Sequence, residues 1–151
     1  MATPVHYIPI VTTLVALAFT PLVFRRWRAR RPAPHLFWWS AGIALYGVGT
    51  LTESLTTLFG WNEWVFRSWY ISGALLGGAP LAQGTAYLLL KRRTADTIAT
   101  LLIAVVAVAS VFVVLTPIQT ELVEPHRLTG AVMEWQKVRL FSPFINTYAF
   151  L

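Results

Sequence analysis

The feature that most constrains the fold is a long run without charge. No Asp, Glu, Lys or Arg occurs between Asp96 and Glu121, and the centre of the run, residues 98–115, is rich in Ala, Val, Leu and Ile. A transmembrane α-helix needs about 20 predominantly apolar residues to cross the hydrocarbon core of a bilayer. The run therefore predicts a membrane-spanning helix over residues 97–117.

Three other segments are apolar over a similar length and are flanked by arginine, lysine or tryptophan. They cover residues 6–24, 36–60 and 65–90. The chain is 56% hydrophobic and only 12% charged, whereas about 25% of residues are charged in a typical soluble domain. We therefore expect a single all-α domain over residues 1–151, an integral membrane bundle of four transmembrane helices.

The basic residues predict how this bundle is oriented. Eight of the twelve lie in two runs at the ends of apolar segments: Arg25, Arg26, Arg28, Arg30 and Arg31, and then Lys91, Arg92 and Arg93. Basic residues next to spans are retained in the cytoplasm. We expect both basic loops inside and the N-terminus outside, in a prokaryotic cytoplasmic membrane. The first run can also hold anionic lipid headgroups; nucleic acid is not an expected partner.

The last third of the chain predicts shorter elements. Apolar residues recur at helical spacing over residues 128–140, which favours a helix lying in the membrane interface. Residues 141–151 are apolar again but too few to cross a bilayer as a helix. They either re-enter or lie along the surface, or they begin a fifth span that is cut short, and we favour the truncated span.

The second predicted helix carries the only acidic residue inside any predicted span, Glu53. A carboxylate in hydrocarbon is costly unless it is paired, protonated or hydrated, so Glu53 should face protein. Helical spacing places four further residues on the same stripe: Gly42, Tyr46, Gly49 and Thr57. The two glycines favour close approach of a neighbouring helix.

The expected neighbour is the third predicted helix, because the turn between the two is short. Folding the chain there brings Arg67 within reach of Glu53, and a buried Glu53–Arg67 ion pair would fix the register of the two helices. Two alternatives stay open: Glu53 forms a proton or cation site, or Arg67 extends to the interface while Glu53 is neutral or bonded elsewhere.

The third predicted helix has a stripe of small residues at Gly73, Gly77 and Gly84, together with Pro80. Small residues four apart favour close helix packing in membranes. Alternatively, the glycines and Pro80 unwind the helix in mid-membrane beside Gln83, as in the binding sites of many transporters.

The aromatic and histidine residues favour no cofactor. Most of the seven tryptophans lie at predicted interfaces, where a belt of amphipathic rings is expected. The histidines lie at span ends or in loops, so none is placed to ligate haem in mid-membrane. A metal site on the outer side would have to use His6, Glu121, Glu124 and His126; we expect exposed loop residues there instead. The absence of cysteine excludes disulfides and thiolate sites.

Several short motifs over residues 36–90 carry a family resemblance. They are LYGVGTLTE at residues 45–53, GW at 60–61, RSWY at 67–70, GALLG at 73–77 and LAQGTAYLL at 81–89. These motifs resemble a group of uncharacterised prokaryotic multi-pass membrane proteins. The resemblance implies about seven spans and no activity.

The sequence contains no phosphate-binding loop, zinc-protease helix or nucleophile elbow. We therefore expect a non-enzymatic protein, a sensor-like module or an accessory or structural subunit that contacts lipid and other membrane subunits or further copies of itself. The alternative is a small-solute or proton-coupled ion transporter whose path is lined by Glu53, Arg67, Tyr46 and Gln83. An enzyme would require a catalytic constellation supplied by further residues downstream.

Overall fold

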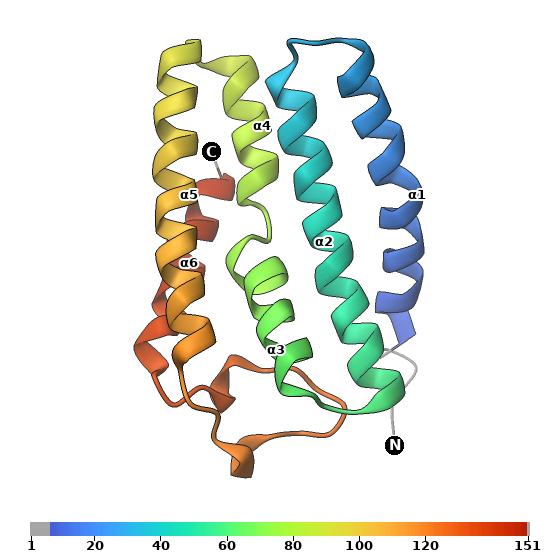
Figure 1. Ribbon diagram of the computed structural model, residues 1–151, viewed down its shortest axis with the longest axis vertical. Helices are drawn as coiled ribbons and strands as arrows, with labels where there is room; N and C mark the ends of the chain where they lie inside the picture. The colour runs from blue at the N-terminus through green and yellow to red at the C-terminus, as the bar shows by residue number, and fades with distance from the viewer. Residues whose placement is uncertain (1–6, 151) are drawn as a thin grey trace.

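The computed structural model describes residues 7–150, and this part of the chain is all-helical with no strand. Figure 1 shows the order of the elements. The longer ones are α1 (Ile8–Ala29), α2 (Pro34–Phe59), α3 (Glu63–Trp69), the π-helix η2 (Tyr70–Leu75), α4 (Ala79–Leu89), α5 (Arg92–Leu115) and α6 (Phe141–Thr147). Short 3₁₀ helices are η3 (Thr120–Leu122), η4 (Gly130–Val132), η5 (Gln136–Leu140) and η6 (Tyr148–Phe150). The expected start of the first span, His6, lies outside the described residues.

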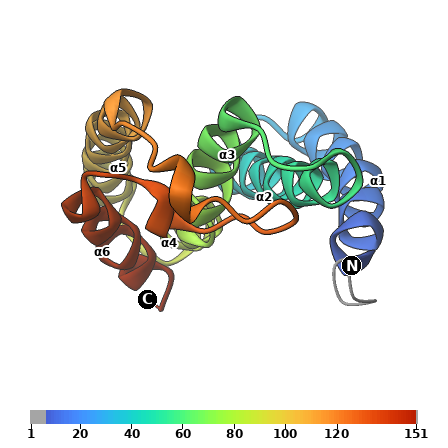
Figure 2. The same ribbon diagram turned by 90° about the horizontal axis from the view of Figure 1, so that it is seen from below.

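The long helices form a curved row in which each packs against its neighbours in sequence. α1 packs against α2, α2 packs against α3, η2 and α4, and α4 packs against α5. Seen from below, the loop after α5 and helix α6 lie on one face of this row (Figure 2). The two basic runs lie together at one end of the molecule, where α1 turns into α2 and α4 turns into α5 (Figure 1).

Two helices, α1 and α5, are long and apolar enough to cross a membrane. Only 11% of the most apolar window of α1 and 17% of that of α5 is buried within the protein, so most of their apolar side chains face outward. α2 has the length of a span, but it is rich in glycine, serine and threonine. Within the described residues, two of the four predicted spans therefore meet the requirements of length and composition.

α2 buries its hydroxyl groups without leaving them unpaired. Thr52, Ser54 and Thr56 are buried, and each donates to a backbone carbonyl three or four residues earlier, at 2.6, 2.8 and 3.0 Å. The hydroxyl of Thr50 accepts a hydrogen bond from Thr13 of α1 at 2.9 Å. Because their hydrogen bonds are satisfied within the helices, these polar residues can pack in an apolar environment.

The turn between α2 and α3 has clear local causes. α2 ends at Phe59 because Gly60 adopts a φ of 87°, which glycine tolerates best. Asn62 then caps α3, its side-chain oxygen accepting hydrogen bonds from the amides of Trp64 and Val65 at 2.9 and 3.2 Å. The short turn makes α2 and α3 antiparallel neighbours, as the sequence predicts.

The third predicted helix, residues 65–90, is interrupted, which corresponds to the unwound alternative and not to one continuous helix. The chain instead forms α3, η2 and α4 with a break at residues 76–78, and we call these elements together the interrupted third helix. Pro80 lies in the first turn of α4. Because proline has no amide hydrogen and its ring clashes with the carbonyl four residues earlier, it favours a break here, whereas Pro21 is accommodated inside α1.

The predicted interfacial helix over residues 128–140 is wrong. The segment forms only η4 and η5, since its backbone bonds to the strand-like stretch after α5: Gln119 donates to Val132 at 2.7 Å and Glu134 donates to Pro117 at 2.9 Å. These bonds take the place of a helical ladder. Met133 is fully buried instead of lying at a membrane surface.

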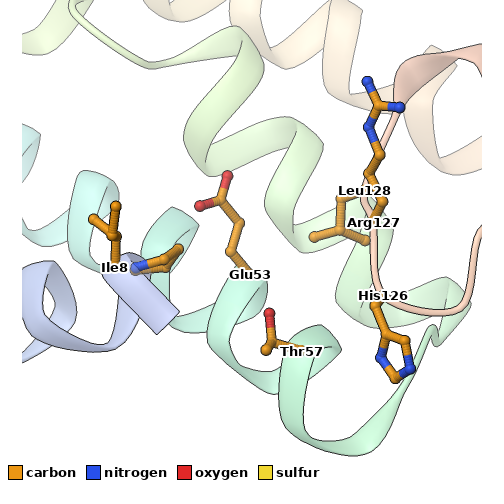
Figure 3. A pocket seen from close by; sticks show the side chains of 7 residues that line it. Ile8, Glu53, Thr57, His126, Arg127 and Leu128 are labelled. Atoms are coloured by element: carbon orange, nitrogen blue, oxygen red, sulfur yellow. The ribbon is translucent and has the colours of Figure 1, made fainter. Parts of the chain in front are cut away.

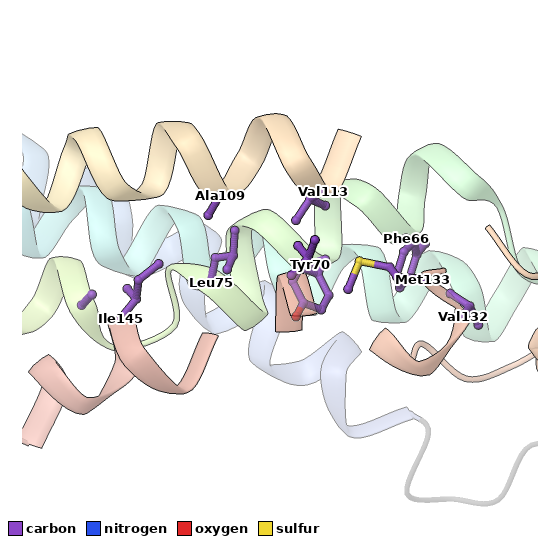
Figure 4. Close-up of a cluster of buried hydrophobic side chains, with 10 residues drawn as sticks. Phe66, Tyr70, Leu75, Ala109, Val113, Val132, Met133 and Ile145 are labelled. Atoms are coloured by element: carbon purple, nitrogen blue, oxygen red, sulfur yellow. The ribbon is translucent and has the colours of Figure 1, made fainter. Parts of the chain in front are cut away.

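Residues 141–150 fold back against the row as α6 and η6, contacting η2, α4 and α5. Ile145 is buried in the main hydrophobic core (Figure 4), whose other members come from the interrupted third helix, α5 and the loop: Phe66, Tyr70, Leu75, Ala79, Ala109, Val113, Val132, Met133 and Val138. The segment therefore packs against the other helices, and whether it re-enters a membrane stays a prediction. A fifth span remains an expectation.

Candidate polar groove around Glu53

Glu53 lies on α2 about two turns before its end, half-buried, with a carboxylate oxygen accepting a hydrogen bond from the Trp69 indole N–H at 2.9 Å. The indole comes from the last residue of α3, so the bond joins α2 to the interrupted third helix. Because the indole is a neutral donor, this hydrogen bond gives Glu53 a partner but no cation.

Glu53 borders two cavities. The larger, of about 550 Å³, runs between α2 and the interrupted third helix, and we call it the Glu53 groove; besides Glu53, its wall includes Tyr46, Gly49, Trp69, Gly73 and Gly78. The smaller, of about 330 Å³, is the outer pocket; its lining includes Ile8, Thr57, His126, Arg127 and Leu128. Glu53 therefore lines both the outer pocket, named for its place at the end of the molecule opposite the basic turns, and the Glu53 groove.

The outer pocket brings together three separate parts of the chain. Figure 3 shows Glu53 and Thr57 on α2, Ile8 at the start of α1, and the loop residues around Leu128. The guanidinium of Arg127 points away from Glu53 in this view and is bonded at 3.4 Å to Glu124. Arg127 therefore lies near the pocket without neutralising the carboxylate.

The glycines of the groove permit a close approach of helices. A methyl group added at Gly49 would lie 3.2 Å from the Cα atom of Gly73, and one added at Gly42 would lie 2.7 Å from the Leu81 side chain. At Gly84 the added atom would be 2.3 Å from the Trp39 ring. These positions agree with the predicted packing role of the glycine stripes.

The break in the third helix is bridged by a side chain from α6. In an unbroken helix the Gly78 amide would bond to the Ala74 carbonyl. Instead, the Asn146 amide group is inserted between them: its nitrogen donates to the Ala74 carbonyl at 2.8 Å, and its oxygen accepts from the Gly78 amide at 3.3 Å. The Ser142 hydroxyl also donates to the Ala74 carbonyl. The Gly78 amide and the Ala74 carbonyl, which the break separates, are therefore both paired within the protein by α6.

The expected Glu53–Arg67 pair is wrong. Arg67 is buried and bonds through its guanidinium to Glu63, one helical turn earlier, at 2.6 Å, and to the backbone carbonyls of Val113 and Thr116 at the end of α5. In residues 7–150 the ion pairs join Arg67 to Glu63, Arg92 to Asp96 and Arg127 to Glu124, so Glu53 takes part in none. Arg67 has no part in the groove.

The other two predicted polar residues lie in different places. Tyr46 lines the Glu53 groove and is 49% exposed. Gln83 is fully buried on the opposite side of α4, where its nitrogen donates to the Ala95 carbonyl at 2.9 Å and its oxygen accepts from the Tyr148 hydroxyl at 3.0 Å. The structure thus brings Glu53 and Tyr46 to one groove, while Gln83 joins α4 to α5 and to the C-terminal segment.

The outer residues considered as metal ligands do not form a site where the structure describes them. His6 lies outside the described residues, and no group of three or more His, Asp or Glu side chains in residues 7–150 is arranged to hold a metal ion. His126 instead borders the outer pocket.

Sequence reasoning overlooked Glu63, Trp69, Ser142 and Asn146. Glu63 had a recognisable signal, because it lies four residues before Arg67 and such pairs meet on a helix surface. Asn146 had none, since its contacts with the third helix depend on how α6 folds back.

No family model, curated protein or solved structure matches this chain. The family resemblance over residues 36–90 therefore remains an expectation from the sequence.

Proposed function

We propose that this chain is a non-enzymatic multi-pass membrane protein in which the Glu53 groove is a recognition surface within the bilayer. The protein would act as a sensor-like module or as an accessory subunit of a membrane complex. Four helical segments would span the membrane, with the N-terminus outside and both basic loops in the cytoplasm. The outward-facing apolar side chains of α1 and α5 support membrane residence.

The observation that carries this proposal is an uncompensated carboxylate in an open, glycine-lined groove. A buried structural carboxylate is normally paired with a cation. Glu53 instead has an indole N–H as its partner and borders two cavities. Tyr46, Trp69 and the glycines offer a narrow surface on which a helix or a small cationic group can lie.

The test is photo-crosslinking from inside the groove. A benzophenone amino acid is placed at Tyr46, which is 49% exposed in the groove, and, as the matched control, at Phe19, an aromatic residue of α1 that is 54% exposed. We expect the probe at position 46 to give a discrete protein or small-molecule adduct in native membranes, and the probe at position 19 to give only lipid adducts. Identical lipid adducts from both positions would show that the groove is an ordinary lipid-facing surface.

Proton-coupled transport is the second candidate, and a specific observation favours it. The outer pocket leads to Glu53, and the groove continues from there to the helix break at Gly78, so one carboxylate connects an outer opening with interrupted backbone. In liposomes with a potassium-diffusion potential, wild-type protein should then admit protons, detected by an internal pH dye, and Glu53→Gln should not. Equal proton entry by the wild type and Glu53→Gln would remove this candidate.

A further inference from the structure

A third cavity lies at the basic end of the molecule, where α1 turns into α2. It has a volume of about 510 Å³ and is lined by Arg26 from α1, by Arg30, Pro32 and Ala33 from the turn, and by His35, Leu36 and Trp39 from α2. It is separate from both cavities that border Glu53. Neither the Glu53 groove nor the packing of the core accounts for it.

The cavity is positively charged and has no counter-ion of its own. Arg26 lies in the last turn of α1 and Arg30 is the residue that directly follows the helix, and both side chains line the cavity. The ion pairs of residues 7–150 do not include either arginine, and no acidic residue precedes Glu53 in the sequence. Arg31, by contrast, stacks on the Trp27 ring at 4.0 Å. Two guanidinium groups therefore border one cavity with their charge unbalanced.

The positive charge of the cavity comes from the two arginines. The partial charges of the two helix ends at this turn oppose each other, because α1 ends at Ala29 and α2 begins at Pro34. His35 adds a further hydrogen-bonding group at the same place. Guanidinium groups bind phosphate with paired, charge-assisted hydrogen bonds, which makes a phosphate the ligand best matched to this wall.

The rest of the wall is apolar and continues into an aromatic cluster. Leu36 and the Trp39 ring line the cavity, and Trp39 is held by a hydrogen bond from its indole to the Leu81 carbonyl at 3.2 Å. Beside the same turn, Trp27 packs against Phe24 and Phe37 with ring centroids 5.1 and 5.3 Å apart. Aromatic rings gather at the depth of lipid headgroups. A ligand that joins a phosphate to an apolar body fits both parts of this cavity.

We infer that the cavity formed by Arg26, Arg30 and His35 binds the phosphate of one anionic phospholipid. The inference rests on the proposed membrane residence, with this end of the bundle at the headgroup layer. The two arginines hold the phosphate diester, and the glycerol and upper acyl chain lie against Leu36 and Trp39. The site differs from general attraction to the basic run, because it depends on which arginines remain and not only on how many.

The experiment compares two double variants that lose the same charge from the same helix end. Arg26→Gln/Arg30→Gln removes the arginines of the cavity, while Arg25→Gln/Arg28→Gln removes two arginines that do not line it. Each full-length protein is purified in mild detergent, incubated with phosphatidylglycerol or phosphatidylcholine, and examined by native mass spectrometry for retained lipid.

Wild-type protein should retain one phosphatidylglycerol in preference to phosphatidylcholine. Losing the cavity arginines should weaken retention about tenfold or more, because charge-assisted hydrogen bonds contribute about 1.5–3 kcal/mol each and 1.4 kcal/mol corresponds to tenfold in affinity. The Arg25→Gln/Arg28→Gln control should stay within about twofold of wild type, since neither residue lines the cavity and neither therefore forms a charge-assisted hydrogen bond to the phosphate.

Three results would overturn the inference. Equal losses from the two double variants would mean diffuse attraction to the basic run. Equal retention of the two lipids would mean that the headgroup charge is not recognised. Release of the bound lipid by millimolar inorganic phosphate would mean that the site takes the free anion.

A charge-preserving variant keeps the test decisive if the glutamine variant does not fold. Arg26→Lys/Arg30→Lys retains both charges but loses the paired geometry of guanidinium. If the cavity is a specific site, this lysine variant should retain clearly less phosphatidylglycerol than wild type. If the attraction is diffuse, the retained amount should not change. Membrane orientation is measured in a separate experiment, in which single cysteines are labelled in intact cells. A wrong orientation and a missing lipid site therefore give different results.

Discussion

At the scale of single residues, Arg67 and Glu53 do not form the ion pair that the sequence predicts, and each has a different partner. Arg67 was expected to neutralise an acid on the neighbouring helix, but Glu63 lies one turn away on its own helix and needs no tertiary contact to reach it. The remaining guanidinium donors pair with the last carbonyls of α5, which lack partners within their own helix. Arg67 therefore holds the structure together, and Glu53 is left available in the groove.

Replacing Arg67 should destabilise the protein strongly. Arg67→Met keeps much of the side-chain volume but leaves the Val113 and Thr116 carbonyls without their donor, and each unpaired buried group costs about 1–3 kcal/mol. We expect the free energy of unfolding in detergent to fall by about 2 kcal/mol or more. Glu53→Gln is the control and should cost less than about 1 kcal/mol, because an amide oxygen still accepts from Trp69. Similar losses for the two variants would contradict the roles assigned here.

At the scale of elements, the third helix shows which features local sequence predicts and which depend on residues far away in the chain. An interruption of this helix is one of two alternatives that the sequence predicts, from Gly77, Gly78 and Pro80. The steric clash of the proline ring gives the physical reason for the interruption. The partner that stabilises the break could not be read from the sequence, because Asn146 comes from α6, which is far away along the chain. The helical spacing of residues 128–140 predicts a helix that does not form, because the backbone of this segment bonds to residues 117–119 instead. These bonds also join parts of the chain that local sequence does not connect.

Removing the Asn146 bridge should loosen both segments that it joins. Asn146→Ala leaves the Gly78 amide without its acceptor and removes one donor from the Ala74 carbonyl. Amide hydrogen exchange should therefore become faster in residues 74–78 and 141–150 together. Thr147→Ala is the matched control, because that exposed hydroxyl bonds only within α6, to Pro143. Faster exchange in α6 alone would mean that the break is stable without the bridge.

Two glycine-to-alanine substitutions should have opposite effects. At Gly84 the new methyl group would lie 2.3 Å from the Trp39 ring, so α2 and α4 must separate, and overpacking of this kind costs about 1–3 kcal/mol. At Gly73 the nearest atom is 3.7 Å away, an ordinary contact, and alanine favours helical backbone by up to about 1 kcal/mol. Thermal unfolding in detergent should show a lower midpoint for Gly84→Ala and an unchanged or higher one for Gly73→Ala. A lower midpoint for both would place the tight contact elsewhere.

At the scale of the whole molecule, the all-helical class follows from the sequence, and so does the shared end of the two basic runs. Both depend on long apolar segments joined by short connections at residues 30–33 and 60–62. Because these connections are short, neighbouring helices run antiparallel. The Glu53 groove could be predicted only in part. The stripe of α2 is readable from helical spacing, but its partner Trp69 and the loop that covers the outer pocket depend on tertiary packing.

The proposed orientation can be tested with single cysteines, because the natural chain has none. Glu121→Cys and Thr94→Cys place one thiol at each end of the molecule, and both positions are exposed. A maleimide that cannot cross membranes should label position 121 in intact cells and position 94 only after lysis, because basic loops stay in the cytoplasm. The reverse pattern would invert the bundle, and labelling of both positions in intact cells would argue against membrane crossing between them.

The curved row of helices has a further consequence for stability. α1 has α2 as its packing neighbour and buries only Thr13 and Ala16, so it forms an outer flank without support on its far side. The core around Phe66 and Met133 draws nothing from α1. The stability of this core therefore does not depend on α1, whose place in the molecule is fixed by its long contact with α2.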